Sequence, residues 1–147
     1  MKAFVLQFVR WTQAAAPVLD LAIRLYVAEV FFRSGLLKVK NWSGTLYLFR
    51  EEYRVPLLPP ELAAWFGMFN ELFFPVLLAL GLAGRFAAAA LSFFNAIAVI
   101  SFWHVLKGNE AALNSHIFWG FLLLVTLCHG PGGLSLDHWI WSRFRES

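Results

Sequence analysis

Four blocks of apolar residues alternate along this chain with short polar or turn-rich segments. The blocks span residues 17–37, 61–82, 85–106 and 110–128. Each block holds about 20 residues, which is the length that a helix rising about 1.5 Å per residue needs to cross a hydrocarbon core of about 30 Å. The pattern therefore predicts four membrane-spanning helices.

The connections between the later blocks are short. Residues 81–84 read Gly-Leu-Ala-Gly, and residues 107–109 read Lys-Gly-Asn. Because such connections leave no room for a crossover, the helices that they join must pack as antiparallel neighbours. We expect an all-α integral membrane protein, an antiparallel four-helix bundle that forms a single domain over residues 1–147.

Three segments outside the apolar blocks combine aromatic residues at helical spacing with charged residues. The aromatic and apolar positions are Phe4, Phe8 and Trp11 near the N-terminus, Leu46, Phe49 and Tyr53 in the first loop, and Trp139 and Trp141 near the C-terminus. This composition is typical of helices that lie in the plane of a membrane interface. We expect an amphipathic interfacial helix in each of the three segments.

Composition excludes the common classes of soluble protein. Hydrophobic residues make up 60% of the chain and charged residues 14%, whereas a soluble domain averages about 45–50% and about 25%. The single cysteine, Cys128, excludes a disulfide scaffold and the paired thiols of a membrane thiol oxidase. Lys and Arg are scattered without a basic patch, which argues against nucleic-acid binding despite a net charge of +3. The predicted surroundings are a lipid bilayer.

An even number of spans places both termini on the same side of the membrane. Lys and Arg residues divide evenly between the two predicted sides, so the positive-inside rule gives no decision. We favour the cytoplasmic side for both termini.

Polar residues lie near the middle of three predicted spans, at Glu29, Glu71 and Asn95. An ionisable residue at the centre of a bilayer costs about 2.5–3.5 kcal/mol on the insertion scale, so it normally faces the bundle interior and has a partner. Because the three residues occur at similar depth, we expect them to line one polar cavity.

The first span also carries charges at helical spacing. Asp20 precedes Arg24 by four residues and Glu29 precedes Arg33 by four, the favourable order for an ion pair within a helix. Under one interpretation each pair neutralises itself and holds the bundle together. Under the other, Glu29 and Arg33 face Glu71 across the cavity, where a proton or a quinone carbonyl is handled.

Two histidines fall near the membrane surface opposite the termini. His104 lies at the end of the third span and His116 lies two turns into the fourth. Imidazoles from adjacent helices are ligands for haem iron or copper, which makes these two residues a candidate metal site. The alternative is that each histidine forms hydrogen bonds between helices.

Several motifs resemble the DoxX family of membrane proteins. Residues 24–38 open with Arg24 and place Gly35 before Lys38, as in the first span of that family. Asn70-Glu71 and the turn at residues 80–85 resemble its second block, and residues 129–132 and 134–137 resemble its C-terminal region. The resemblance covers residues 18–137.

The resemblance implies a four-helix protein of the bacterial inner membrane. The family is named for its relation to the membrane subunit of a thiosulfate:quinone oxidoreductase, and some members associate with redox-defence enzymes. We therefore expect a redox-linked membrane subunit that binds quinone or handles protons, and at most a subunit of a quinone-linked oxidoreductase. The candidate residues are Arg24, Glu29, Arg33, Lys38, Asn70, Glu71 and Asn95. A soluble or membrane protein partner would supply the electrons.

The alternative is a non-enzymatic membrane module that binds a partner, transports a small solute or acts in metal stress, with haem or copper on His104 and His116. Pro75 lies one turn after Glu71 and frees a backbone carbonyl there, so a local kink could shape a site in either case.

Overall fold

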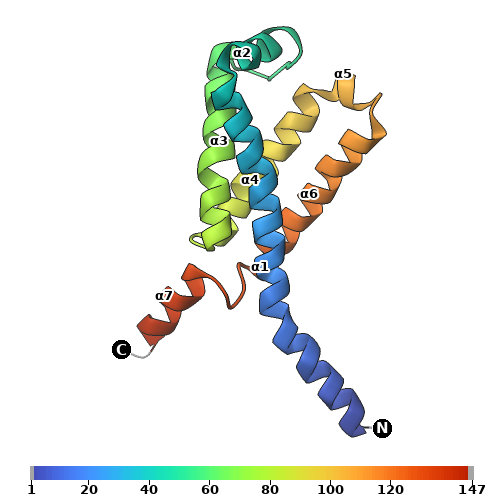
Figure 1. The fold of residues 1–147 in the computed structure, drawn as a ribbon, viewed down its shortest axis with the longest axis vertical. Helices are drawn as coiled ribbons and strands as arrows, with labels where there is room; N and C mark the ends of the chain where they lie inside the picture. The colour runs from blue at the N-terminus through green and yellow to red at the C-terminus, as the bar shows by residue number, and fades with distance from the viewer. Residues whose placement is uncertain (1, 146–147) are drawn as a thin grey trace.

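The computed structural model describes residues 2–145, and this range contains seven helices and no strand. The helices are α1 (Lys2–Lys40), α2 (Trp42–Glu51), α3 (Pro60–Leu80), α4 (Gly84–Ser101), α5 (Trp103–Leu106), α6 (Glu110–His129) and α7 (Leu136–Arg145) (Figure 1). The prediction of an all-α protein is confirmed. The predicted domain also includes residues 1, 146 and 147, which lie outside the described range.

Three helices, α3, α4 and α6, are long and apolar enough to cross a membrane. They coincide with the predicted spans at 61–82, 85–106 and 110–128. The third prediction was too long, because α4 ends at Ser101 and α5 follows as a separate turn. The backbone N–H of Arg54, from the first loop, donates a hydrogen bond to the Ser101 carbonyl at 3.0 Å. In a longer helix this carbonyl would accept a hydrogen bond from a later residue of the same helix.

The N-terminal region differs from the prediction. α1 runs without a break from Lys2 to Lys40, with Pro17 inside it, so no separate helix precedes the first span. Residues 14–16 are alanines, the strongest helix formers, and they favour one continuous helix across this point. The first part of α1 projects beyond the other helices, where Phe4, Phe8 and Trp11 are exposed (Figure 1).

The long helices pack side by side. α1 lies against α3 over the second half of its length, α3 against α4, and α4 against α6 (Figure 1). Their shared core consists of Val27, Phe31, Leu78, Ala87, Ala88, Leu91 and Leu123. The alanines allow the helix backbones to approach closely, which is the usual means of helix association in membranes.

The first loop contains the helix that the aromatic spacing predicted. Asn41 caps α2 by accepting a hydrogen bond from the backbone N–H of Gly44 at 3.1 Å. Phe49 then packs against Ala63 and Ala64 at the start of α3. α2 therefore closes the end of the bundle above the α1–α3 contact.

Candidate functional site

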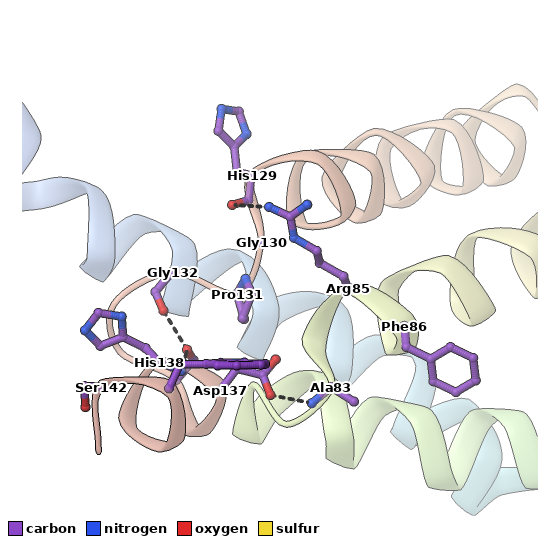
Figure 2. Close-up of a pocket in the computed structure, with 12 residues that line it drawn as sticks. Ala83, Arg85, Phe86, His129, Gly130, Pro131, Gly132, Asp137, His138 and Ser142 are labelled. Carbon is purple, nitrogen blue, oxygen red and sulfur yellow. Dashed lines mark hydrogen bonds between the residues drawn. The ribbon is translucent and has the colours of Figure 1, made fainter. Parts of the chain in front are cut away.

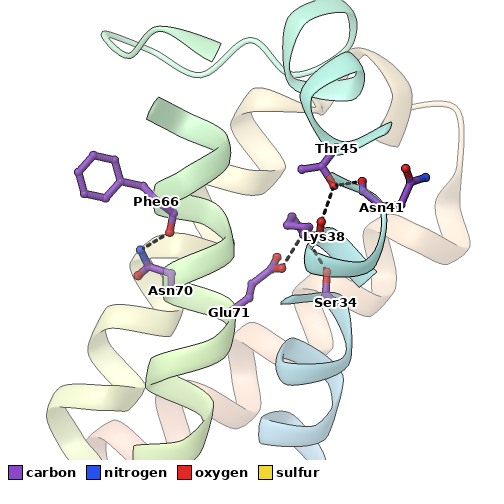
Figure 3. Close-up of polar contacts among 7 residues, drawn as sticks. All are labelled: Ser34, Lys38, Asn41, Thr45, Phe66, Asn70 and Glu71. Atoms are coloured by element: carbon purple, nitrogen blue, oxygen red, sulfur yellow. Dashed lines mark hydrogen bonds and ion pairs between the residues drawn. The ribbon is translucent and has the colours of Figure 1, made fainter. Parts of the chain in front are cut away.

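A buried charged pair joins the end of α1 to the middle of α3. Lys38 Nζ lies 2.6 Å from Glu71 Oε2 and donates a second hydrogen bond to Ser34 Oγ at 3.1 Å (Figure 3). The two side chains are 16% and 8% exposed. Because the ammonium and the carboxylate are both shielded from solvent, their attraction is stronger than that of an exposed ion pair.

Gly35 explains why the pair forms at this level. A Cβ atom on Gly35 would lie 3.0 Å from the Cβ and the backbone carbonyl carbon of Glu71, so only glycine allows the helices to approach so closely. Lys38 lies about one turn further along α1 and reaches Glu71 from there. Asn70, the neighbour of Glu71, points away and donates to the Phe66 carbonyl at 2.9 Å (Figure 3).

A cavity of about 460 Å³ lies beside the pair. α1 contributes Ser34 and Lys38 to its lining, and α2 contributes Thr45 and Phe49. Tyr53, which follows α2, lines it as well. The cavity thus combines hydrogen-bonding groups with an aromatic surface.

Tyr53 is held by aromatic stacking on both sides. Its ring lies 4.7 Å from the ring of Phe49 and 4.7 Å from that of Phe102, with interplanar angles of 15° and 14°. Burial, together with the negative charge of Glu71, raises the pKa of the Tyr53 hydroxyl, which therefore remains a hydrogen-bond donor at neutral pH. The sequence pattern indicates Tyr53 only as part of an apolar stripe and gives no sign of its place beside the cavity.

The structure does not bring Glu29 and Arg33 together with Glu71. Glu29 Oε1 lies 3.4 Å from Arg33 Nη1, and the side chains are 64% and 78% exposed. Each residue of a helix is rotated by about 100° from the one before, which places this pair opposite the buried face of α1. The expectation of one shared cavity is therefore corrected: Glu29 and Arg33 pair with each other, and Glu71 pairs with Lys38.

Asn95 also has a partner elsewhere. Its Nδ2 donates to the backbone carbonyl of His116 at 2.9 Å, and its Oδ1 lies 2.8 Å from His116 Nδ1. This double contact joins α4 to α6. A Cβ atom on Gly120 would lie 3.4 Å from Asn95 Nδ2, an ordinary contact distance, so Gly120 lies next to this amide.

The two candidate metal ligands have different partners. His116 contacts Asn95, whereas His104 Nε2 lies 3.2 Å from Glu52 Oε2. Within residues 2–145 no group of three or more His, Cys, Asp and Glu side chains is arranged to hold a metal ion. The contacts of both histidines fit the alternative interpretation, hydrogen bonding between segments.

Arg24 is completely buried at the other end of the α1–α3 contact. Its Nη1 donates to the carbonyls of Leu78 and Ala79 at 3.2 and 2.9 Å, and its Nη2 donates to the carbonyl of Leu134. These include carbonyls at the end of α3 that lack partners within the helix. Arg24 therefore binds the end of α3 and the segment before α7, away from the Lys38–Glu71 pair.

Asp137 completes this junction. Its two oxygens accept hydrogen bonds from the backbone N–H groups of Ala83 and Gly84, each at 2.8 Å, and so cap the start of α4. Figure 2 shows the contact with Ala83. An open pocket of about 970 Å³ surrounds the junction on the side of the termini, with Arg85 donating to the His129 carbonyl at 3.3 Å. The role of Asp137 was missed, since its partners lie more than fifty positions away in the sequence.

Comparisons with known proteins agree with this architecture. The family model described as DoxX matches residues 19–104, more than half of the chain. An uncharacterized protein from Haemophilus influenzae is 32% identical over 124 residues, which cover 80% of this chain and 80% of that protein. No solved structure matches. The matched range contains Lys38, Tyr53 and Glu71.

Proposed function

Because the chain belongs to the DoxX family of membrane proteins, we propose that it is a redox-linked membrane subunit that binds quinone beside the Lys38–Glu71 pair. The observation that carries this proposal is a shielded ion pair of 2.6 Å that adjoins a cavity of about 460 Å³. The site replaces the shared cavity at Glu29 and Asn95 that the sequence led us to expect.

In this proposal α1 crosses the membrane with α3, α4 and α6 as a four-helix bundle. Val27 and Phe31 of α1 are buried in the same core as the three apolar helices, which supports a common depth. The buried charges of α1 have partners inside the protein, since Arg24 binds carbonyls and Lys38 binds Glu71. Helices α2 and α7 then lie at opposite interfaces of the bacterial inner membrane, with both termini cytoplasmic.

The lining of the cavity suits a quinone head group. Its volume falls within the range of about 300–1,000 Å³ that is usual for small-molecule sites. The Lys38 ammonium and the Tyr53 hydroxyl are donors for the two carbonyl oxygens of a quinone, and Phe49 offers an apolar surface to its ring.

The residues at the site would bind the substrate and move protons. Reduction of a quinone to a quinol takes up electrons and protons in equal number, and a redox partner protein would supply the electrons. Lys38 passes two protons in succession to the quinone oxygens, and water at the membrane interface restores its ammonium after each transfer. Glu71 keeps the ammonium beside the cavity from inside the bundle. The chain is then one subunit of a quinone-linked oxidoreductase rather than a complete enzyme.

Retention of quinone tests this proposal. The protein is purified in mild detergent, and bound quinone is measured by mass spectrometry for the natural chain, Glu71→Gln and the control Glu29→Gln. We expect Glu71→Gln to weaken binding by folded protein about tenfold or more, because it removes the carboxylate that holds the Lys38 ammonium beside the cavity. Thermal unfolding of the same samples gives the folded fraction. The exposed control should bind normally. Quinone-free natural protein, or equal binding by all three chains, would contradict the proposal.

A second candidate is a non-enzymatic module that binds a protein partner. It is favoured by the projecting part of α1, where Phe4 and Trp11 are 78% and 68% exposed. A chain that retains no quinone, and loses a co-purifying protein when residues 2–13 are removed, would favour this candidate over the first.

A further inference from the structure

The outer face of α1 carries a charged pair, Glu29 and Arg33. The buried residues Arg24, Val27, Phe31 and Gly35 define the face that packs against the bundle. At about 100° per residue, Arg33 points in the opposite direction to Arg24. The exposed residues around this outward direction are Ala22, Tyr26, Glu29, Arg33, Leu36 and Lys40. Their separations alternate between four and three residues.

The Glu29–Arg33 pair lies within the apolar depth of the bundle rather than at its edge. Glu29 lines a shallow, almost wholly apolar groove of about 330 Å³ together with Pro75 and Val76. Both of these residues lie inside α3, one of the three helices apolar enough to span a membrane. If α1 crosses the membrane as the proposed function requires, the Glu29 and Arg33 side chains of a monomer would be surrounded by the hydrocarbon of the lipids.

This exposure is the opposite of the usual arrangement. Ionisable residues within membrane segments normally face the protein interior and are paired there. Here one contact of 3.4 Å joins side chains that are 64% and 78% exposed, so most of each charged group has no protein around it. A protein surface that supplies opposite charges at the same depth would remove the unfavourable exposure.

We propose that a second copy of this chain covers the outer face of α1. The α1 helices of the two copies run parallel about a two-fold axis along the membrane normal, and Glu29 of each copy pairs with Arg33 of the other. The neighbouring groove, lined by Leu25, Phe32 and Val76, receives apolar side chains from the same interface.

Charge complementarity favours a second copy over an unrelated partner. Insertion in the membrane fixes the direction and depth of the chain, so a second copy presents the same residues at the same level. In a two-fold dimer the same surface of each copy contacts its equivalent, so that surface must carry both the acid and the base of each ion pair. Glu29 and Arg33 meet this requirement, because they lie one turn apart on the outer face of α1. The alternating spacing also matches the repeat by which parallel helices pack along a seam.

Disulfide formation in native membranes tests the position of the interface. Cys128, which is exposed, is first replaced by serine so that no native thiol remains. Ala22→Cys and Leu36→Cys each place a single thiol on the seam, which is the outer face of α1 where the two copies would meet. One lies before and the other after the Glu29–Arg33 pair. Phe93→Cys is the control on the exposed face of α4. We expect oxidation to give covalent dimers from the two seam variants alone. Equal yields from Phe93→Cys would overturn the proposal.

A charge swap tests the pairing. Arg33→Glu places like charges at the seam and should weaken dimerisation in lipid nanodiscs at least tenfold, whereas Glu29→Arg combined with Arg33→Glu should restore it. Ala22→Phe keeps every charge but adds bulk at the seam, and it should weaken the dimer as well. Failure of the swap to restore the dimer, or a monomeric natural chain at all concentrations, would overturn the proposal. A monomer that retains quinone overturns this inference and leaves the proposed function intact.

Discussion

Each buried cation of α1 is stabilised by a different kind of partner. Lys38 meets the carboxylate of Glu71, whereas Arg24 meets backbone carbonyls at the end of α3. Such side chains remain buried only if their partners remain, so single and double substitutions should behave very differently.

Replacing Lys38 alone should strongly destabilise the protein. Lys38→Met leaves Glu71 buried without its partner, and removal of one member of a buried ion pair typically costs about 3–5 kcal/mol. Lys38→Met combined with Glu71→Leu removes both charges and should recover most of this loss. The measurement is thermal unfolding in detergent for the single and double variants. A double variant as unstable as the sum of the two single variants would contradict the pairing.

Ionisation of Tyr53 should occur above the usual range for tyrosine. Burial and the charge of Glu71 raise its pKa in the folded protein, so the unfolded chain loses this proton first as the pH increases. The contribution to stability is therefore constant below a pH of about 10, the ordinary tyrosine pKa, and is lost as the pH rises from there through the folded pKa.

The difference in ultraviolet absorbance between the natural chain and Tyr53→Phe isolates this ionisation. We expect the tyrosinate signal of Tyr53 only above a pH of about 10, with a smaller loss of stability at alkaline pH in Tyr53→Phe. A Tyr53 signal that appears at or below the ordinary tyrosine pKa would show that the hydroxyl is not buried beside Glu71.

At the scale of helices, apolar length predicted α3 and α6 almost to their ends. Both are mostly apolar runs of about 20 residues that begin at strong signals, namely Pro59-Pro60 at the start of α3 and Asn109, which caps α6. The end of α4 was not predictable in the same way. Its last carbonyl is satisfied by Arg54, a contact between segments far apart in sequence.

The sequence pattern also could not predict which face of its helix a polar residue occupies in the bundle. Depth along a span follows from counting residues, and it correctly placed Glu71 and Asn95 inside the bundle. Which neighbour each one meets depends on how the helices rotate against one another. Gly35 sets that rotation for Glu71, because it permits the close contact of α1 and α3.

The turn between α3 and α4 should tolerate no side chain at Gly81. This residue has a φ of +64°, and a Cβ atom there would lie 2.5 Å from Arg24 Nη1. Gly81→Ala should therefore destabilise the protein by about 1–3 kcal/mol. Gly108→Ala is the matched control, since its Cβ would meet only the Val105 carbonyl at 3.6 Å. Thermal unfolding of the two variants makes the comparison, and equal stability would argue against the Arg24 junction.

At the scale of the whole molecule, two polar clusters lie toward opposite ends of the bundle. Arg24 and Asp137 fix the α3–α4 turn and the segment before α7 on the side of the termini. Lys38, Glu71 and Tyr53 gather toward the opposite end, beneath α2. The contacts at the end with the termini are structural and border an open pocket of about 970 Å³. The other end contains the cavity to which we assign the chemistry.

Photolabelling tests that assignment most directly. A photoreactive quinone analogue is added to native membranes that contain the protein, and the labelled peptides are identified by mass spectrometry. We predict that label attaches to residues 34–53 and that excess natural quinone competes with it. Lys38→Met combined with Glu71→Leu, which recovers most of the stability, should reduce the label at least tenfold. Label confined to α4 and α6 around Asn95, or label that natural quinone does not displace, would contradict a quinone site beside Lys38 and Glu71.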